Sequence, residues 1–550
     1  MFKTNRDHTR LARILCGLVI FLAPFAIYAG SMNNDFLAGD DEAIVLRNVY
    51  LRDLKHFPRI FTENYRAGSG EISNYYRPFQ ILMYVPIVQT VGITPLPFHL
   101  ESIFFHGLCG LFLYIIFLAL FRRPSGEGTT VALAVIALCA LLWTVHPLHN
   151  AEIAVTTGIA SPAHLFWMLF GLFAFIRFER NAKKIWYAAA LGAFVLSLLS
   201  KESAIVFPGL LLGMHATGIK TGIFKRRGIG SFIKRQAPFW ITAGLYVTAR
   251  LTCLNFNNSL NFYGEANVFT QNLVYRLYTA ATVAAHGLRI IFIPAGLHSE
   301  RSWPVFTSFF TPQVFLSVAI LTALAVAAWR LWRKLPLFTF GIFWFFFSYA
   351  PMSNIMAQIN ALVWDHWFYT PAVGVFLAIA SIFSLGFWKK KKILYGAAIA
   401  IFVAAACIFS VITISRNAFW RDTESVSKFI LTYEPQTAKT WNNLAMAQAG
   451  KGKLDEAAAS YARAIELSDT YPQTHHNLAN LYLGLGKYDL AEKEYLRAIE
   501  LDDKFYHSYM ALGKLYLAQG DKKKAAENFR KTLELYPLHE EARELLARTG

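Results

Sequence analysis

The chain has 550 residues, of which 55% are hydrophobic and only 16% are charged. This composition excludes an ordinary soluble protein and is typical of a protein that crosses the membrane several times. The net charge of +18 does not indicate a nucleic-acid partner, because the region from Arg416 onward carries 19 basic and 19 acidic side chains, and basic residues beside membrane spans chiefly set topology. The five cysteines are scattered and indicate neither a disulfide framework nor a metal site.

Apolar runs predict eleven transmembrane helices between residues 1 and 414. The predicted spans are 11–30, 98–121, 129–145, 162–179, 185–199, 202–217, 237–253, 312–330, 336–352, 367–387 and 393–414. This assignment places the N-terminus and every large basic cluster in the cytoplasm. The clusters are 3–13, 122–123, 177–184, 220–235, 330–334 and 389–392. Two further apolar stretches, 79–93 and 272–297, would reverse the pattern, so we expect interfacial or re-entrant helices there.

The first outer loop, 31–78, is the strongest candidate for chemistry. Three acids, Asp40, Asp41 and Glu42, lie directly outside the first span. A carboxylate held there could deprotonate a hydroxyl or bind a metal ion. The alternative is that Asp40 or Asp41 caps an amphipathic helix over 41–57. Both roles are compatible, since capping fixes the direction of a carboxylate.

Further ionisable side chains are expected on the same outer side. Arg77 ends the loop, and an arginine at a membrane surface either binds phosphate or extends to lipid headgroups. Lys201 and Glu202 form a tight turn, where the lysine either binds a lipid phosphate or pairs in solvent. The remaining candidates are His99, His106, His146, His149, Glu152, His298, Glu300, Arg301, Asp365 and His366. For isolated histidines we favour satisfied helix ends over zinc ligands, because the sequence places no third ligand.

Residues 438–539 repeat with a period of 34. Glycines recur at this step, and so do alanines: Gly452, Gly486, Gly520, Ala457, Ala491 and Ala525. This period is typical of tetratricopeptide repeats, in which two antiparallel helices form each unit and the stack binds a protein or peptide. The predicted boundaries are 415–437 for a linker, 438–471, 472–505 and 506–539 for the repeats, and 540–550 for a cap. The predicted groove contains Lys439, Asn442, Met446, Gln473, His476, Asn480, His507, Met510 and Lys514. The predicted fold class is therefore all-α: a polytopic bundle over 1–414, followed by an α-solenoid.

Taken in chain order, the motifs resemble the transmembrane-and-TPR O-mannosyltransferases and their bacterial relatives, which have the GT-C fold. The motifs that carry the resemblance are Asp40-Asp41, Tyr76-Arg77-Pro78, Pro95 to His99 with His106, His146-Pro147-Leu148-His149-Asn150-Ala151-Glu152, Ser200-Lys201-Glu202, Tyr369 with Pro371, and Arg416-Asn417 with Trp420. Each motif is weak alone, and their order and spacing make the match.

The resemblance implies transfer of a sugar from a polyprenyl-phosphate carrier to a protein hydroxyl on the extracytoplasmic face, with inversion. It implies that Asp40 or Asp41 is the general base, and that Arg77, Lys201 and His366 bind the donor phosphate. The implied pocket contains Glu42, Tyr76, His99, His106, His146, His149, Glu152, Glu202 and Asp365. The lipid-linked sugar is the donor substrate, and nothing in the sequence indicates a metal cofactor.

The chain differs from the family pattern in two places. Asp365-His366 stands where the family often has Glu-Arg, and Gly158-Ile159-Ala160-Ser161 stands where it tends to have Gly-Arg-x-(Asp/Glu).

Two other functions stay open: a membrane-anchored scaffold for envelope assembly, and a transporter of lipid-linked sugars, which the apolar inner halves of the spans disfavour. The expected location is a bacterial inner membrane, with a cytoplasmic N-terminus and a periplasmic repeat domain.

Overall fold

The computed structural model describes residues 2–121, 128–217, 219, 229–256, 268–356, 358–359, 361–383 and 392–549. Within these ranges every regular element is a helix, which confirms the all-α fold class. The predicted basic cluster at 122–123 lies outside the described residues. So do 389–391 of the cluster at 389–392, 220–228 of the cluster at 220–235, 384–387 of a predicted span and residue 550 of the cap. The chain divides into two units. The bundle unit comprises Met1–Asp35, Ile44–Tyr65 and Ser73–Trp420, and the repeat unit comprises Phe36–Ala43, Arg66–Ile72 and Arg421–Gly550.

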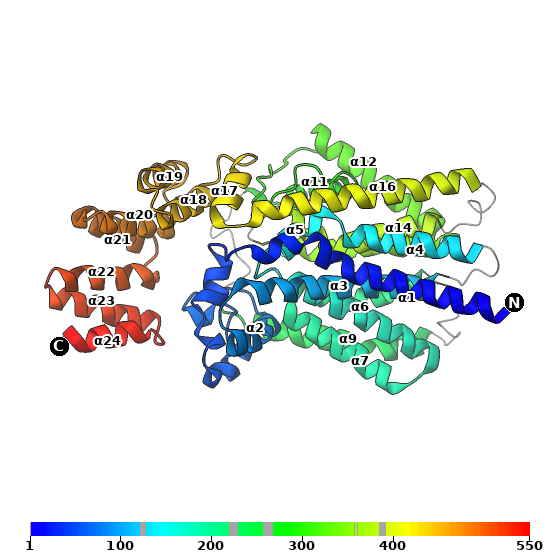
Figure 1. Cartoon of the computed structure of the whole chain (residues 1–550), viewed down its shortest axis with the longest axis horizontal. Coiled ribbons are helices and arrows are strands. Elements are labelled where there is room, and N and C mark those ends of the chain that lie inside the picture. The colour runs from blue at the N-terminus through cyan, green and yellow to red at the C-terminus, as the bar shows by residue number, and fades with distance from the viewer. Residues whose placement is uncertain are drawn as a thin grey trace. The chain divides into compact units, whose positions relative to one another are not determined.

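The bundle unit consists of long helices that lie side by side, with short helices between some of them (Figure 1). Their bounds are α1 Phe2–Ile27, α2 Pro78–Val91, α3 Pro95–Leu120, α4 Gly128–Thr144, α5 Asn150–Ile153, α6 Ala160–Asn181, α7 Lys184–Ser200, α8 Phe207–Ala216, α9 Ile229–Leu251, α10 Val268–Gln271, α11 Leu273–Phe292, α12 Pro312–Leu331, α13 Pro336–Tyr349, α14 Tyr369–Phe383 and α16 Lys392–Asn417. α3 packs on α1 and α6, α6 packs on α7, and α13 packs on α14. Several of these helices begin with proline, whose fixed φ and missing N–H suit the first turn: α2, α3, α12 and α13.

Seven helices of the described chain are long and apolar enough to cross a membrane: Arg10–Ile27, Pro95–Leu120, Leu133–Ile153, Ala160–Asn181, Pro312–Leu331, Asp365–Phe383 and Ile393–Trp420. Three other predicted spans coincide with shorter apolar helices, Lys184–Ser200, Glu202–Ala216 and Pro336–Met352. The stretch predicted not to cross at 79–93 forms α2, which has only 14 residues. The total of eleven spans stays a prediction.

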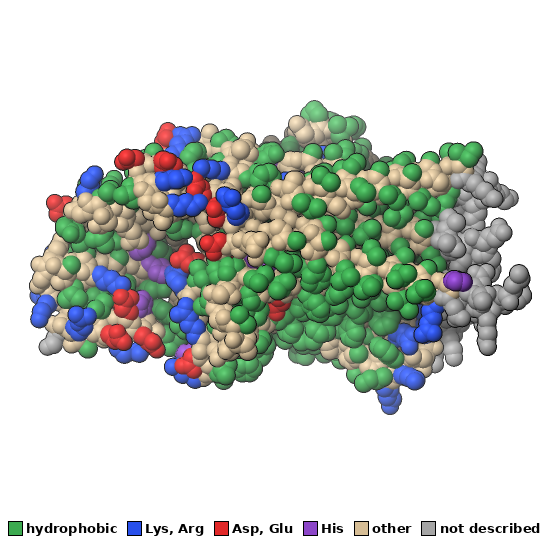
Figure 2. Space-filling view, in the orientation of Figure 1, with side chains coloured by type: hydrophobic (Ala, Val, Ile, Leu, Met, Phe, Trp, Pro, Cys, Tyr) green, Lys and Arg blue, Asp and Glu red, His purple; other side chains and the backbone are tan. Residues whose placement is uncertain are grey.

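The surface of the bundle unit is apolar where a bilayer would cover it. Large hydrophobic side chains are exposed along α12 and α16, for example Phe315 and Ile320 on α12 and Ile401 and Ile408 on α16. Figure 2 shows hydrophobic side chains over most of the visible face of the bundle. Such continuous apolar surface would be unfavourable in water, so these faces contact lipid and the protein is an integral membrane protein.

The described part of the repeat unit contains one helix, then three helical hairpins and a final helix. Its helices are α17 Thr423–Leu431, α18 Ala438–Gly450, α19 Leu454–Leu467, α20 Pro472–Gly484, α21 Tyr488–Leu501, α22 Tyr506–Ala518, α23 Lys522–Leu535 and α24 Glu540–Thr549. The hairpins pair α18 with α19, α20 with α21 and α22 with α23. The repeating glycines end the first helix of each hairpin with a positive φ between 71° and 86°, which glycine adopts without strain. The repeating alanines are fully buried and let the paired helices approach closely.

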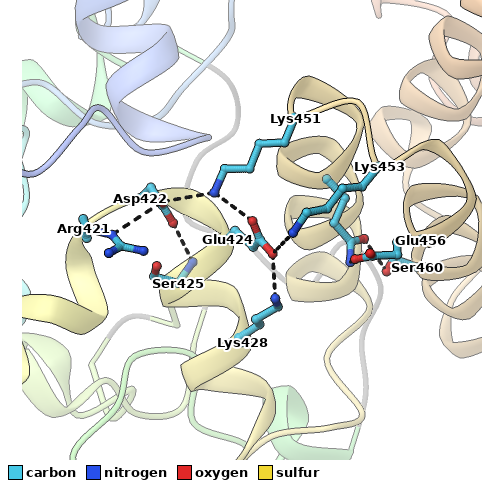
Figure 3. Close-up of polar contacts among 10 residues, drawn as sticks. Arg421, Asp422, Glu424, Ser425, Lys428, Lys451, Lys453, Glu456 and Ser460 are labelled. Carbon is cyan, nitrogen blue, oxygen red and sulfur yellow. Dashed lines mark hydrogen bonds and ion pairs between the residues drawn. The ribbon is translucent and has the colours of Figure 1, made fainter.

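The segment after the last span is helical over much of its length, although the sequence indicates only a linker over 415–437. It contains the end of α16 and all of α17. α17 is joined to the first hairpin by Glu424, which is 8% exposed and whose carboxylate lies 2.6 Å, 2.7 Å and 3.0 Å from the ammonium groups of Lys428, Lys451 and Lys453 (Figure 3). The lysines hold the pKa of Glu424 well below its usual range.

Replacing Glu424 with glutamine is expected to loosen α17 from the first hairpin. The change removes three ion pairs from a buried carboxylate, but the lysines are half-exposed and regain water, so we expect a loss of about 1–2 kcal/mol. Hydrogen exchange of α17 and α18 in the full-length protein measures this loss. Glu466→Gln is the matched control, because Glu466 is 68% exposed and pairs only locally with Arg463. Equal exchange in wild type and Glu424→Gln would contradict the assigned role.

His475 makes the stability of the repeat unit depend on pH. Its ring lies 2.7 Å from both the Glu494 and Asp469 carboxylates and is 5% exposed. Burial lowers the pKa of His475, but the two carboxylates together raise it above its usual value. This stabilisation is complete below the unfolded pKa of about 6.5 and is lost as the pH rises through the folded pKa.

The melting temperature of the repeat unit should therefore fall between pH 6 and alkaline pH, and His475→Gln should reduce that fall. Thermal unfolding of the full-length protein, followed by circular dichroism at several pH values, measures both. A fall of the same size in His475→Gln would show that another group titrates.

The helix expected over 41–57 is absent, and this prediction is wrong. The chain forms short turns instead: a π-helix over Glu42–Leu46, then 3-10 helices over Val49–Leu51 and Leu54–Phe61. The side chain of Asn48 accepts from the amide of Tyr50, and that of Asp53 accepts from the amide of Lys55. Each bond starts a new turn, because short polar side chains compete with the helical ladder.

Candidate functional site

A cluster of charged side chains in the bundle unit gathers at the ends of its helices. Arg77 precedes α2, Glu152 lies in α5, and Lys201 and Glu202 join α7 to the following 3-10 helix, Glu202–Val206. His366 lies in a 3-10 helix, Asp365–Phe368, just before α14. These charged groups are therefore positioned by the ends of helices and by short helical turns between helices, and not by the face of one long helix. The structure brings these five predicted residues together in two linked contacts.

Arg77 and Glu202 form the first contact. Arg77 Nη2 lies 2.8 Å from Glu202 Oε1, and Nε lies 3.2 Å from Oε2, which is the bidentate geometry of a strong pair. The guanidinium also lies over the rings of Tyr75, at 4.5 Å, and Tyr65, at 5.7 Å. Burial lowers the pKa of Arg77, but the Glu202 carboxylate raises it above its usual value, so the group stays charged. The sequence does not predict this aromatic support.

Lys201, Ser161, Glu152 and His366 form the second contact. Lys201 Nζ donates to Ser161 Oγ at 2.6 Å, and Ser161 Oγ donates to Glu152 Oε1 at 2.7 Å. The same Glu152 oxygen lies 3.6 Å from Lys201 Nζ and 3.8 Å from His366 Nε2. Ser161 occupies the place where the resembled family tends to have an acid. Its hydroxyl bridges the cation and the remaining acid, a role that the sequence does not reveal.

Gly158 packs directly against the backbone of Glu152. A Cβ at Gly158 would lie 2.0 Å from the carbonyl oxygen of Glu152 and 2.7 Å from its carbonyl carbon. No side-chain rearrangement removes a clash with backbone. Position 158 therefore requires a glycine.

Asp365 belongs to a separate buried network. Arg301 binds it through Nη2 at 2.8 Å and Nε at 3.0 Å, His286 Nε2 lies 2.9 Å away, and the amide of His298 donates to it at 3.0 Å. Asp365 is 4% exposed. Its contacts indicate a structural role, with Arg301 as its cationic partner.

The four histidines predicted to line the pocket lie in the helical core. Each ring is at most 1% exposed and lies within hydrogen-bond distance of a backbone carbonyl. The pairs are His99 with Asn34, His106 with Thr144, His146 with Ile291 and His149 with Trp143. These contacts fit the alternative that the histidines satisfy helix ends. Tyr76 is similar: its hydroxyl donates to the carbonyl of Phe61 at 3.0 Å.

The acidic triplet of the first loop lies in the repeat unit. Asp41 is 1% exposed and accepts a hydrogen bond from the amide of Leu37 at 2.8 Å. Asp40 has a 57% exposed side chain and pairs with Arg66. Glu42 begins the π-helix that follows. Of the three, Asp40 is the carboxylate with the most solvent access.

Several residues predicted to line the groove of the repeats also contact a neighbouring helical unit. Asn442 accepts from Asn477 at 3.1 Å, His476 lies 3.1 Å from the hydroxyl of Ser508, and Lys514 pairs with Glu541 at 2.6 Å. Met510 is 6% exposed. Exposed members are Lys439, Gln473, Asn480 and Lys514, and partly exposed members are Met446, His476 and His507. Among the described residues, no three His, Cys, Asp or Glu side chains converge on a point that could hold a metal ion.

The repeat unit matches two sequence-family models. One is described as tetratricopeptide repeat and covers residues 470–537, and the other is described as TPR repeat and covers residues 449–486. Residues 449–537 form tetratricopeptide repeats. Such repeats present a stacked helical surface for protein contacts, so this tetratricopeptide domain indicates a protein partner. Among solved structures, the crystal structure of MamA is similar to part of this chain, with 22% sequence identity and a TM-score of 0.22. The match covers 23% of this chain and 74% of the MamA chain.

The chain as a whole is similar to proteins named protein O-mannosyl-transferases. The relative F38B6.6 of Caenorhabditis elegans is 23% identical over 83% of this chain, and TMTC4 of Mus musculus is 23% identical over 82%. TMTC4 of Homo sapiens is 22% identical over 83% of this chain and 68% of its own length. The matches span 63% and 66% of the first two relatives, so the chain covers just under two thirds of each. The predicted resemblance is confirmed, and it includes both the bundle and the tetratricopeptide domain.

Proposed function

We propose that the chain transfers a mannose-type sugar from a polyprenyl-phosphate donor to a hydroxyl group of a protein. One observation carries the proposal: Arg77 and Lys201, two cations at broken helix ends of an apolar bundle, lie in a chain similar to protein O-mannosyl-transferases over 83% of its length. Both cations keep donors for a phosphate. Arg77 Nη1 has no hydrogen-bond partner among the described residues, and Lys201 uses its ammonium group on one hydroxyl and one carboxylate.

The chemistry requires a base, a nucleophile and a stabilised leaving group. The acceptor hydroxyl gives its proton to a carboxylate, its oxygen forms a bond to the anomeric carbon, and the bond from that carbon to the phosphate oxygen breaks with its electron pair on the phosphate. The configuration inverts. By the resemblance, Asp40 or Asp41 is the proposed base. Arg77 and Lys201, with His366 by the resemblance, stabilise the departing phosphate, and Ser161 and Glu152 hold Lys201 in place.

The proposed site faces away from the cytoplasm. The basic clusters assign the N-terminus to the cytoplasm and the tetratricopeptide domain to the opposite side, which for the proposed bacterial inner membrane is the periplasm. The donor is then a membrane lipid, and the tetratricopeptide domain recruits the acceptor protein or a partner.

Intact-mass analysis of envelope proteins tests the proposal. Cells carrying the wild type are compared with a deletion strain and with an Asp40→Asn, Asp41→Asn double variant at equal protein levels. We expect a hexose mass shift that the deletion and the double variant both lose. Asp53→Asn is the matched control, since Asp53 lies in the same loop but is exposed and pairs with Lys55. An identical glycoprotein profile in the wild type and the deletion would reject the transferase and favour a scaffold.

A further inference from the structure

The repeat unit holds a segment of the first loop in a specific site. Residues Arg66–Ile72 belong to this unit although the chain around them belongs to the bundle unit. The segment forms a short 3-10 turn, Ala67–Ser69, closed by Gly70. Tyr506 donates its hydroxyl to the carbonyl of Ser69 at 2.7 Å, and Tyr536 donates to the carbonyl of Gly68 at 3.0 Å.

The site is built for a turn with small residues. Tyr506 and Tyr536 are 6% and 8% exposed, and their ring centroids lie 5.1 Å apart. Gly70 sits against both rings, since a Cβ there would lie 2.6 Å from Tyr536 Cγ and 2.9 Å from Tyr506 Cε1. Its φ of +78° also favours glycine. The hydroxyls of Tyr506 and Tyr536 thus donate hydrogen bonds to backbone carbonyls of the turn. Their packed rings leave no room for a side chain at position 70.

The bound segment contacts the acidic triplet Asp40, Asp41 and Glu42 through Arg66. Arg66, the first residue of the held segment, pairs with Asp40 and donates to Glu71 at 2.9 Å. The acidic segment is also held from the other end of the repeat unit, because the amide of Ala38 donates to Thr423 Oγ1 in α17 at 2.9 Å. Asp40 is therefore connected to both the third hairpin and α17 within one unit.

We propose that the third hairpin of the tetratricopeptide domain binds Arg66–Ile72 as an internal ligand, which makes Arg66 a positioning residue for Asp40. Tyr506 and Tyr536 fix the turn, the turn fixes Arg66, and Arg66 fixes the direction of the Asp40 carboxylate. The binding of the segment stands on its own, whereas the consequence for activity rests on the proposed function. The tetratricopeptide domain then both recruits a partner and holds the loop that supplies the proposed base.

Hydrogen exchange of the full-length protein in nanodiscs tests the binding. We expect slow exchange over 66–72 in the wild type, and exchange about tenfold faster or more in a Tyr506→Phe, Tyr536→Phe double variant, which loses both hydrogen bonds but keeps the rings. Gly70→Ala should have the same effect. Unchanged exchange in α22 and α23 shows that the hairpin stays folded. Tyr488→Phe is the control, because Tyr488 is 51% exposed. Equal exchange over 66–72 in wild type and double variant would overturn the binding.

Kinetics of Arg66 variants test the positioning role separately. Arg66→Gln should lower kcat about tenfold or more, leave KM for the donor lipid unchanged and speed exchange over 37–43, while Arg66→Lys should restore part of the rate. Full activity of Arg66→Gln, in a protein that Asp40→Asn inactivates, would overturn the positioning role. A wild type without transfer activity would reject the proposed function, and the exchange data would still decide whether the segment is bound.

Discussion

Arg77→Gln is expected to lower the rate of sugar transfer by about a hundredfold or more. The guanidinium is the proposed electrostatic partner of the departing phosphate, and removal of one well-placed donor from such a site typically costs about 100- to 1000-fold in rate. Arg77 is held by Glu202 and by two tyrosine rings, so its position is fixed before a donor arrives. The measurement is the rate of sugar transfer by the purified protein at saturating donor lipid.

Two variants separate phosphate binding from the loss of an ion pair. Arg77→Lys keeps the charge but cannot form the bidentate contact, so it should fall between wild type and Arg77→Gln. Glu202→Gln removes the negative charge but keeps a side-chain oxygen that accepts a hydrogen bond from Arg77, so it should retain most of the activity. If Glu202→Gln and Arg77→Gln lose equal activity, the pair is structural and Arg77 does not act on the phosphate.

Gly158→Ala is expected to lower the free energy of unfolding by about 2–3 kcal/mol and to reduce transfer at least about tenfold. The added methyl group would lie 2.0 Å from the backbone oxygen of Glu152, and relief requires movement of α5. That movement breaks the bond from Ser161 to Glu152 and releases Lys201. Thermal unfolding in detergent, followed by tryptophan fluorescence, measures the stability.

Gly192→Ala in α7 is the matched control for this prediction. A Cβ at Gly192 would meet no atom within 4 Å, and alanine is favoured over glycine in a helix by about 1 kcal/mol. Gly192→Ala should therefore be as stable as the wild type or more stable. A Gly158→Ala protein with wild-type stability and activity would show that the backbone at Glu152 tolerates displacement and does not hold the cluster.

The fold could be predicted from sequence where a pattern repeats or a run is long. The hairpins begin at Ala438, Pro472 and Tyr506, the first residues of the predicted repeats, because small and large residues recur every 34 positions. Prediction failed over 41–57, where Asn48 and Asp53 bond to nearby amides and break the helix into turns. Local bonds of this kind leave no periodic signal.

The site could be predicted only in part. The motifs identify Arg77, Glu152, Lys201, Glu202 and His366, and the structure brings these five together. The histidines at 99, 106, 146 and 149 belong to the helical core instead, because their depth depends on packing between helices that are distant in sequence. Ser161, Arg301 and Arg66 gain their roles from partners 9 to 64 positions away, a distance at which spacing carries no information.

The most direct test of the transferase is the release of polyprenyl phosphate from polyprenyl-phosphate-mannose by the purified full-length protein in nanodiscs, supplied with envelope proteins from the deletion strain. We expect the wild type to release the lipid phosphate and to add a hexose to an acceptor in equal amounts. We expect Lys201→Gln, when it is equally folded and present at the same level, to be much slower than the wild type in both. A wild type that binds envelope proteins through its tetratricopeptide domain but neither cleaves the donor nor adds a hexose would contradict the central claim.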